Sequence, residues 1–116
     1  MIIRVKDLRL RPIVGVNEWE RKVRQDVVIN LAIEPRTESS AESDELSETS
    51  DYKAIAKRII ESVEKTEFQL LERLAGHILD LVFEDPTVGR AAVEIDKPHA
   101  LRFADSVSVE LERSRE

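Results

Sequence analysis

Four side chains in this sequence could move protons or bind a polar ligand: Glu20, Tyr52, Glu72 and Lys97. Lys97 ends an alternating segment and precedes Pro98, which restricts the backbone before it to extended conformations. We therefore expect Lys97 at the edge of a sheet, where the chain turns. A lysine in such a place could donate or accept a proton, although an ordinary exposed lysine fits the same pattern.

The other three candidates also have two interpretations each. Glu72 lies at the start of a predicted helix, where it could bind the hydrogen-bond donors of a ligand or simply interact with the helix dipole. Tyr52 opens an earlier predicted helix, and its ring could pack in the core while its hydroxyl reaches a neighbouring site. Glu20 follows Gly15 in a loop and could equally be a solvated carboxylate. Each of these signals alone is weak.

The composition excludes several kinds of site. The 116 residues include no cysteine, which rules out thiolate metal sites, disulfides and cysteine nucleophiles. His77 and His99 have no partner at metal-ligand spacing, and the sequence has no phosphate-binding glycine loop and no G-x-S-x-G motif. We therefore predict no metal and no cofactor. The net charge of −6 argues against a nucleic-acid partner.

The hydropathy pattern argues against a membrane protein. No apolar run approaches the roughly 20 residues that a spanning helix needs, and the opening MIIRVKDLRLR alternates apolar and charged residues, unlike a signal peptide. We expect a cytoplasmic protein with no membrane partner. The length suits one domain over residues 1–116. Only 4% of the residues are aromatic, so the expected core is aliphatic.

Four segments are predicted as strands and two as helices. Alternating apolar residues mark strands over residues 3–10, 25–34, 92–97 and 104–112, and a break in parity within the first predicts a bulge near Lys6 and Asp7. Helical spacing marks helices over 51–65 and 70–83, the first with Ser50 or Thr49 as its N-cap. The order ββααββ predicts an α+β fold, an antiparallel four-stranded sheet with both helices on one face.

Residues 36–50 are acidic, rich in serine and almost free of apolar side chains. We predict a solvated loop with a helical turn around residues 41–46. The carboxylates could suggest a calcium site, but their spacing matches no EF-hand loop, which needs a glycine at its sixth position. The segment is therefore interpreted as a solvated surface.

The order of the candidate residues along the chain resembles that of a known family. A glycine precedes a glutamate by five residues, a tyrosine opens the first helix, a leucine–glutamate pair opens the second, and the third strand ends in lysine and proline. These residues are Gly15, Glu20, Tyr52, Leu71, Glu72, Lys97 and Pro98. Together with the segment VEIDKPHALRF, they resemble the dihydroneopterin aldolases and their close relatives, the dihydroneopterin triphosphate 2'-epimerases.

The resemblance implies a metal-free carbon–carbon lyase of folate and pterin biosynthesis. In that family the dihydropterin ring accepts the electrons of the broken C1′–C2′ bond, so that 7,8-dihydroneopterin yields 6-hydroxymethyl-7,8-dihydropterin and glycolaldehyde. Glu72 would pair with the guanidine-like edge of the pterin, and the backbone of Leu71 would orient the ring. Lys97 would manage protonation near N5 and Tyr52 would move a proton of the side chain. Glu20 would hold the substrate or its water.

The resemblance also implies an assembly. Members of the family have the tunnelling fold (T-fold), in which the sheets of four subunits join into a barrel and two tetrameric rings stack as a homo-octamer. Joining the sheets covers edge strands that would otherwise be unprotected. The active site would lie between subunits, with Tyr52 reaching in from a neighbour.

The sequence leaves the branch of the family open. Aldolase cleavage is the predicted main activity. Epimerisation, which cleaves the same bond and re-adds the aldehyde to the opposite face, is the alternative. His99 and Arg102 would favour a phosphorylated substrate, because arginine binds phosphate bidentately, but Arg102 could instead pair with a strand carboxylate. A non-catalytic pterin- or purine-binding ring protein and a purely structural ring are alternatives of other classes.

Overall fold

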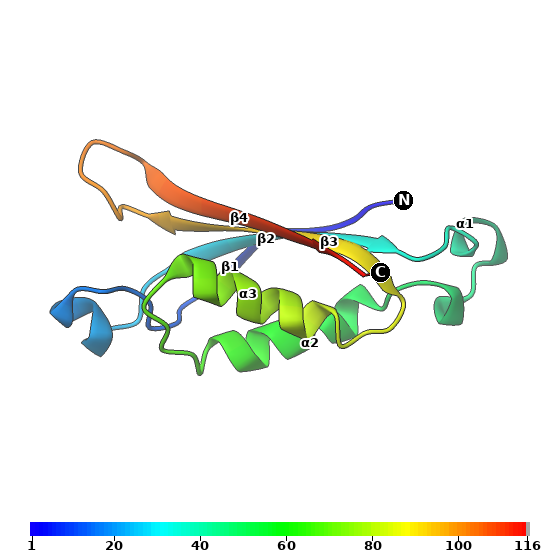
Figure 1. Cartoon of the computed structure of the whole chain (residues 1–116), viewed down its shortest axis with the longest axis horizontal. Coiled ribbons are helices and arrows are strands. Elements are labelled where there is room, and N and C mark those ends of the chain that lie inside the picture. Colours follow the sequence, from blue (N-terminus) through cyan, green and yellow to red (C-terminus); the bar gives the residue numbers. More distant parts are fainter. Residues whose placement is uncertain (116) are drawn as a thin grey trace.

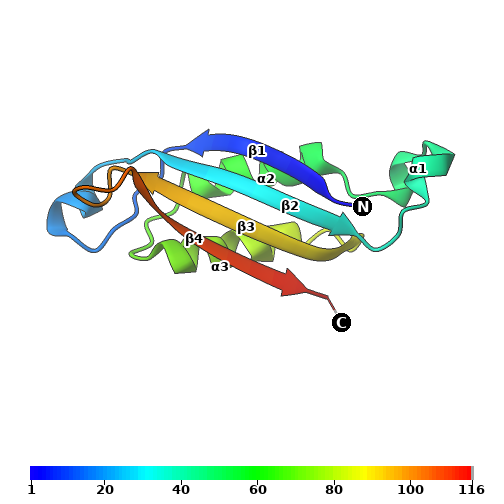
Figure 2. The same ribbon diagram turned by 90° about the horizontal axis from the view of Figure 1, so that it is seen from above.

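The computed structural model describes residues 1–115. Four strands form one antiparallel sheet in the order β1-β2-β3-β4, with bounds Ile3–Leu10, Val27–Pro35, Val88–Pro98 and Ser106–Ser114. Two helices, α2 (Tyr52–Val63) and α3 (Leu71–Val82), cover one face of the sheet and leave the other face open (Figures 1 and 2). This arrangement confirms the predicted α+β fold and its ββααββ order.

The core lies between the sheet and the two helices, because each element turns one apolar face inward. In β2, Val27, Ile29, Leu31 and Ile33 are at most 3% exposed. The helices bury the apolar stripes that helical spacing predicted: Ile55, Ile59 and Val63 from α2, and Leu71, Leu74, Ala75, Ile78, Leu79 and Val82 from α3. Each of the larger aliphatic side chains contributes about 1.5–3 kcal/mol when it is buried.

Strand β1 contains the predicted bulge. Its register against β2 shifts between Val5 and Leu8, and Asp7 has a φ of +55°. The N–H group of Asp7 donates to Oδ1 of Asn30 at 2.9 Å. Because a bulge inserts one extra residue, Leu8 and Leu10 return to the face of the sheet that packs against the core.

Strand β3 is longer than predicted. It begins at Val88 rather than at residue 92, and its register against β2 shifts beside Pro35. This irregularity interrupts the alternation of buried and half-buried residues at the start of the strand, so a period-two pattern does not reveal it. The other predicted elements agree with the structure to within a few residues at each end.

The N-cap of α2 is Asp51 rather than Ser50 or Thr49. The carboxylate of Asp51 accepts a hydrogen bond from the N–H of Ala54 at 3.1 Å. The hydroxyl of Ser50 instead lies 2.8 Å from the hydroxyl of Thr87, just before β3 begins. This contact fixes the first turn of α2 beside the start of β3.

The loop between β2 and α2 is exposed, as predicted. It contains a short helix, α1 (Ser40–Ser43), and a single 3₁₀ turn, η2 (Leu46–Glu48), neither of which buries a residue. A second 3₁₀ helix, η1 (Glu18–Lys22), lies between β1 and β2 at the other end of the molecule (Figure 1). Within residues 1–115, no helix is both long enough and apolar enough to cross a membrane.

Candidate active site

Lys97 is buried because it continues the core-facing series of β3. Val93 and Ile95 point into the core from alternate positions, and Lys97 follows them with an exposed fraction of 8%. A buried ammonium group needs polar partners. Its Nζ donates to Oε2 of Glu20 at 2.5 Å and to the carbonyl oxygen of Val14 at 3.1 Å. An ammonium group has three N–H donors, so one donor is left for a ligand or a water molecule.

Glu20 lies in η1 and is 6% exposed. Besides Lys97, it accepts hydrogen bonds from the backbone N–H of Asn17 and from Nε2 of Gln25, both at 3.1 Å. Burial alone would raise the pKa of Glu20, but the hydrogen bonds from Lys97, Gln25 and Asn17 outweigh it and lower the pKa to about 2. Glu20 is therefore a carboxylate at neutral pH and forms a buried ion pair with Lys97.

Gly15 makes room for the Glu20 carboxylate. Its φ of +146° is one that residues with a side chain rarely adopt. A Cβ atom at this position would overlap the carboxyl group of Glu20. The spacing of Gly15 and Glu20, noted in the sequence as a family pattern, thus has a steric cause in this fold.

Leu71 and Glu72 form the first turn of α3, at the same end of the molecule as η1 and the last residues of β3 (Figure 1). Leu71 is buried and Glu72 is exposed. The first N–H groups of a helix have no partner within the helix, so this turn offers backbone donors beside a carboxylate. The structure therefore brings Glu20, Lys97, Leu71 and Glu72 to the same end of the molecule. Of these four, Glu20 and Lys97 contact each other directly.

Tyr52 lies at the opposite end. It opens α2 next to Asp51, and the contact between Ser50 and Thr87 holds this turn beside the start of β3. From Val88 to Lys97, β3 extends for about 30 Å at about 3.3 Å per residue. The side chain of Tyr52 is 58% exposed and does not pack in the core. Within one chain, Tyr52 and Lys97 do not belong to the same site.

His99 and Arg102 lie in the loop between β3 and β4, directly after the Lys97 end of the strand. His99 has a φ of +60°, and its N–H donates to the carbonyl oxygen of Asp105 at 3.0 Å. Arg102 is exposed, and its guanidinium lies 5.4 Å from the ring centre of Phe103. Within residues 1–115 Arg102 forms no ion pair, so its pairing with a strand carboxylate is not observed.

Sequence reasoning missed two partners of the buried ion pair. The carbonyl of Val14 accepts from both Lys97 and Gln25, the latter at 3.0 Å. Every residue carries a carbonyl, so no residue type marks this contact. Gln25, in contrast, has a signal that could have been used, because it is in phase with the buried Val27 and Ile29. A polar side chain on the core-facing phase of a strand needs a buried partner.

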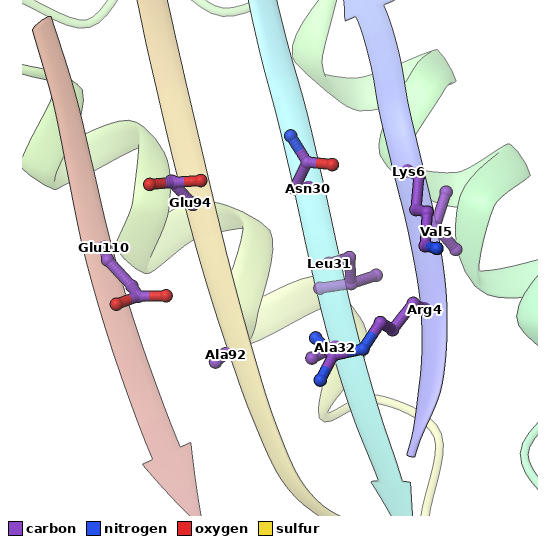
Figure 3. A pocket seen from close by; sticks show the side chains of 9 residues that line it. All are labelled: Arg4, Val5, Lys6, Asn30, Leu31, Ala32, Ala92, Glu94 and Glu110. Atoms are coloured by element: carbon purple, nitrogen blue, oxygen red, sulfur yellow. The ribbon is translucent and has the colours of Figure 1, made fainter.

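The open face of the sheet carries a separate depression of about 290 Å³, which none of the predicted site residues lines. Figure 3 shows Asn30, Glu94 and Glu110 on three neighbouring strands, with Arg4 on the fourth. Within the described part of the chain, no three His, Cys, Asp or Glu side chains lie close enough to hold a metal ion.

Comparison with known proteins identifies the family to which this geometry belongs. Residues 3–112 match the family model described as FolB, dihydroneopterin aldolase. The chain belongs to the dihydroneopterin aldolase family. A relative from Pseudomonas aeruginosa, named dihydroneopterin triphosphate 2'-epimerase, is 51% identical over 109 residues, which cover 94% of this chain and 89% of that protein. The Escherichia coli (strain K12) protein named dihydroneopterin aldolase is 29% identical over 115 residues, covering 97% and 92%.

A solved structure of the dihydroneopterin aldolase family has the same fold. The Escherichia coli dihydroneopterin aldolase in complex with neopterin superimposes with a TM-score of 0.90 at 26% identity, covering 98% of this chain and 99% of that one. The relatives are named for two enzyme activities, so the chain belongs to a family of enzymes. The resemblance inferred from Gly15, Glu20, Tyr52, Glu72 and Lys97 is confirmed at the level of the family.

Proposed function

We propose that this member of the dihydroneopterin aldolase family breaks the C1′–C2′ bond of a dihydroneopterin-type substrate without a metal or another cofactor. The observation that carries the proposal is the buried ion pair between Lys97 and Glu20, which leaves one N–H donor of the ammonium group unused. Support also comes from the family match over residues 3–112 and from the neopterin complex of the Escherichia coli relative.

The bond-breaking step needs a base and an acid. The C2′ hydroxyl passes its proton to the Tyr52 oxygen while the Tyr52 hydroxyl releases its own proton to a water molecule. The aldehyde carbonyl forms, the C1′–C2′ bond breaks, and its electrons move into the C6=N5 imine, whose N5 takes a proton from Lys97 through water. Tyr52 then returns a proton to C1′ and recovers its own from the water, while N5 gives its proton back to Lys97 by the same route, which restores the C6=N5 bond of the hydroxymethyl product. Lys97, whose Nζ donates to Glu20 and has one N–H donor left, acts as the acid in this step.

The substrate is held at the start of α3. The carboxylate of Glu72 accepts two parallel hydrogen bonds from the guanidine-like edge of the pterin, and the backbone of Leu71 orients the ring. Glu20 contributes by fixing Lys97 and the substrate water. These roles use the end of the molecule where η1, β3 and α3 meet (Figure 1).

The proposed mechanism requires a second copy of the chain, because Tyr52 lies beside the start of β3 and Lys97 near its other end, and the strand between them is about 30 Å long. We propose that Tyr52 enters the site from a neighbouring subunit in a ring of four sheets, and that two rings stack as a homo-octamer. The edge strands β1 and β4 of each sheet would then pair with those of neighbouring copies.

The net reaction depends on the fate of the aldehyde. Release gives the aldolase reaction, and re-addition to the opposite face gives epimerisation. The 51% identity to an epimerase, against 29% to an aldolase, favours epimerisation of the triphosphate as the main outcome. His99 and Arg102, exposed directly after the Lys97 end of β3, are the proposed contacts of the phosphate groups.

One experiment tests the proposed step. The protein is incubated with 7,8-dihydroneopterin and with its triphosphate, and chromatography follows glycolaldehyde and the epimer. We expect turnover of at least one substrate, and its loss in Lys97→Met together with retention of neopterin binding. Binding without turnover in the wild-type protein would indicate a non-catalytic pterin-binding protein, and no thermal stabilisation by neopterin would indicate a structural ring.

A second variant tests the choice of substrate. Arg102→Ala should reduce kcat/KM for the triphosphate by about tenfold or more, since an arginine–phosphate contact is charge-assisted, and should leave the unphosphorylated substrate within about twofold. Equal losses on both substrates would contradict a phosphate contact at Arg102.

A further inference from the structure

Arg21 follows Glu20 in η1, but its side chain binds a different part of the molecule. Its Nη1 donates to the carbonyl oxygen of Gly15 at 3.1 Å and to that of Phe68 at 3.0 Å, and its Nη2 donates to the carbonyl oxygen of Glu67. Gly15 lies in the loop between β1 and β2, and Glu67 and Phe68 lie in the linker between α2 and α3. One half-buried guanidinium thus binds three backbone carbonyls from these two loops. Such charge-assisted hydrogen bonds are roughly twice as strong as neutral ones.

The two loops also touch through their backbones, but weakly. The N–H of Gly15 lies 3.3 Å from the carbonyl oxygen of Phe68, and the N–H of Ile13 lies 3.4 Å from that of Thr66. Both distances exceed the usual range for an N–H···O bond, about 2.7–3.2 Å. The contacts of Arg21 are therefore the shorter hydrogen bonds between Gly15 and the linker residues Glu67 and Phe68.

Each loop carries a different half of the candidate site. The first loop supplies Gly15, which accommodates the carboxylate of Glu20, and the Val14 carbonyl, which accepts from Lys97. The second loop leads into α3, whose first turn holds Leu71 and Glu72. The N-cap of this helix, Leu70, makes no side-chain capping bond, so no cap adds to the contacts that Arg21 makes with the linker before it.

We propose that Arg21 is a positioning residue that fixes the spacing between the Lys97–Glu20 pair and the Leu71–Glu72 turn. The identity of the ligand that bridges these two halves rests on the proposed function. Without Arg21, a ligand contacting both halves has to order the linker when it binds, which lowers its affinity. The contacts between Lys97 and Glu20 do not involve Arg21, so the chemical step should change much less.

Arg24 provides a matched control in the same loop. Its Nη1 also donates to two backbone carbonyls, those of Arg11 at 2.9 Å and of Glu64 at 2.6 Å. It also forms an ion pair with Glu64 at 3.6 Å. Arg24 therefore resembles Arg21 in its bonding, but it is attached to the end of α2 rather than to the linker before α3.

The experiment compares Arg21→Met with Arg24→Met. Calorimetry gives the Kd of neopterin, and steady-state kinetics give KM and kcat. We expect Arg21→Met to raise Kd and KM by about tenfold with kcat within about threefold, and Arg24→Met to leave Kd within about twofold. Arg21→Lys keeps the charge without the planar fork and should have an intermediate Kd. It also replaces Arg21→Met in the comparison if that variant does not fold.

Amide hydrogen exchange in residues 66–70 separates this inference from the proposed function. We expect exchange there to be about tenfold faster in Arg21→Met than in Arg24→Met, in the absence of any ligand. If the wild-type chain binds no pterin, the proposed function fails and the exchange rates alone decide the role of Arg21. Unchanged exchange in the linker, equal rises of Kd in both variants, or a loss of kcat at constant KM would each overturn the inference.

Discussion

At the scale of single residues, the ion pair between Glu20 and Lys97 joins positions that are 77 residues apart in the sequence. Both side chains are almost fully buried. The free energy of a buried pair depends on both partners being present, because removal of one leaves the other charge without compensation. Removal of either partner alone should therefore destabilise the fold as well as disturb the proposed chemistry.

Replacing Glu20 by Gln should lower the free energy of unfolding by about 3 kcal/mol at pH 7, since a buried ammonium loses its counter-charge. The pKa of Glu20 is lowered from 4.5 to about 2 on folding, so its carboxylate favours the folded state above pH 4.5. This contribution decreases as the pH falls from 4.5 and is lost below about 2. Urea unfolding of both proteins over this pH range measures the difference.

The neighbouring Glu18 serves as the control for this prediction. Glu18 lies in the same 3₁₀ helix but is exposed, so Glu18→Gln should change stability by less than about 0.5 kcal/mol at any pH. A destabilisation of Glu20→Gln that stays constant down to pH 2 would show that the carboxylate charge is not its cause.

Gly15 should tolerate no side chain. Gly15→Ala combines an unfavourable φ of +146° with overlap between the new Cβ and the Glu20 carboxyl group. We expect a loss of about 3 kcal/mol or more in the free energy of unfolding. Gly76 in α3 has open space where its Cβ would lie, so Gly76→Ala should instead stabilise the protein by about 1 kcal/mol. Urea unfolding distinguishes these opposite signs, and equal effects would contradict the steric explanation.

At the scale of elements, the regular strands and helices could be predicted because each has one buried face. Alternation over residues 25–34 identified β2, which spans Val27–Pro35, and a break in the alternation of β1 located the bulge at Asp7. The start of β3 was missed because the irregular register beside Pro35 disturbs the period of two. A period-two pattern therefore predicts a strand well where the strand pairing is regular, and poorly where the register shifts.

The candidate site was only partly predictable for a related reason. Glu20 and Lys97 were each identified, but their contact depends on how the loop after β1 folds back onto β3. The support from the Val14 carbonyl and the attachment by Arg21 both use backbone oxygens, which no residue type signals. The resemblance to the family predicted which residues belong to the candidate site, and the structure showed the hydrogen bonds between them.

The N-cap of α2 gives a prediction at this scale. Asp51→Ala removes the hydrogen bond to the N–H of Ala54 and should lower the free energy of unfolding by about 1 kcal/mol. Lys53, exposed in the same turn, is a matched control whose replacement by Ala should have an effect below about 0.5 kcal/mol. Urea unfolding at neutral pH measures both. Equal stability of the two variants would exclude a capping role for Asp51.

At the scale of the whole molecule, the separation of Tyr52 from Lys97 predicts complementation between inactive chains. Tyr52→Phe and Lys97→Met should each lack activity alone. In mixed assemblies, some sites combine the intact Lys97 of one chain with the intact Tyr52 of its neighbour, because a heterologous interface joins different surfaces of the two chains. Co-expression in equal amounts should restore about a quarter of the wild-type activity.

The complementation experiment has a control and an outcome that would contradict it. Mixing the purified variants after assembly, without exchange of subunits, should give no activity and serves as the control. If co-expressed chains are also inactive, although mass spectrometry shows mixed assemblies, then Tyr52 and Lys97 do not act in a shared site.

The placement of Tyr52 and Lys97 at opposite ends of β3 also determines how the rate should depend on the concentration of the protein. A site completed only by a neighbour exists only in the associated state, so its abundance follows mass action. On dilution below the dissociation constant of the assembly, specific activity should decline rather than remain constant. Neopterin bound between two chains would oppose this decline, so the substrate itself would promote assembly of the enzyme that consumes it.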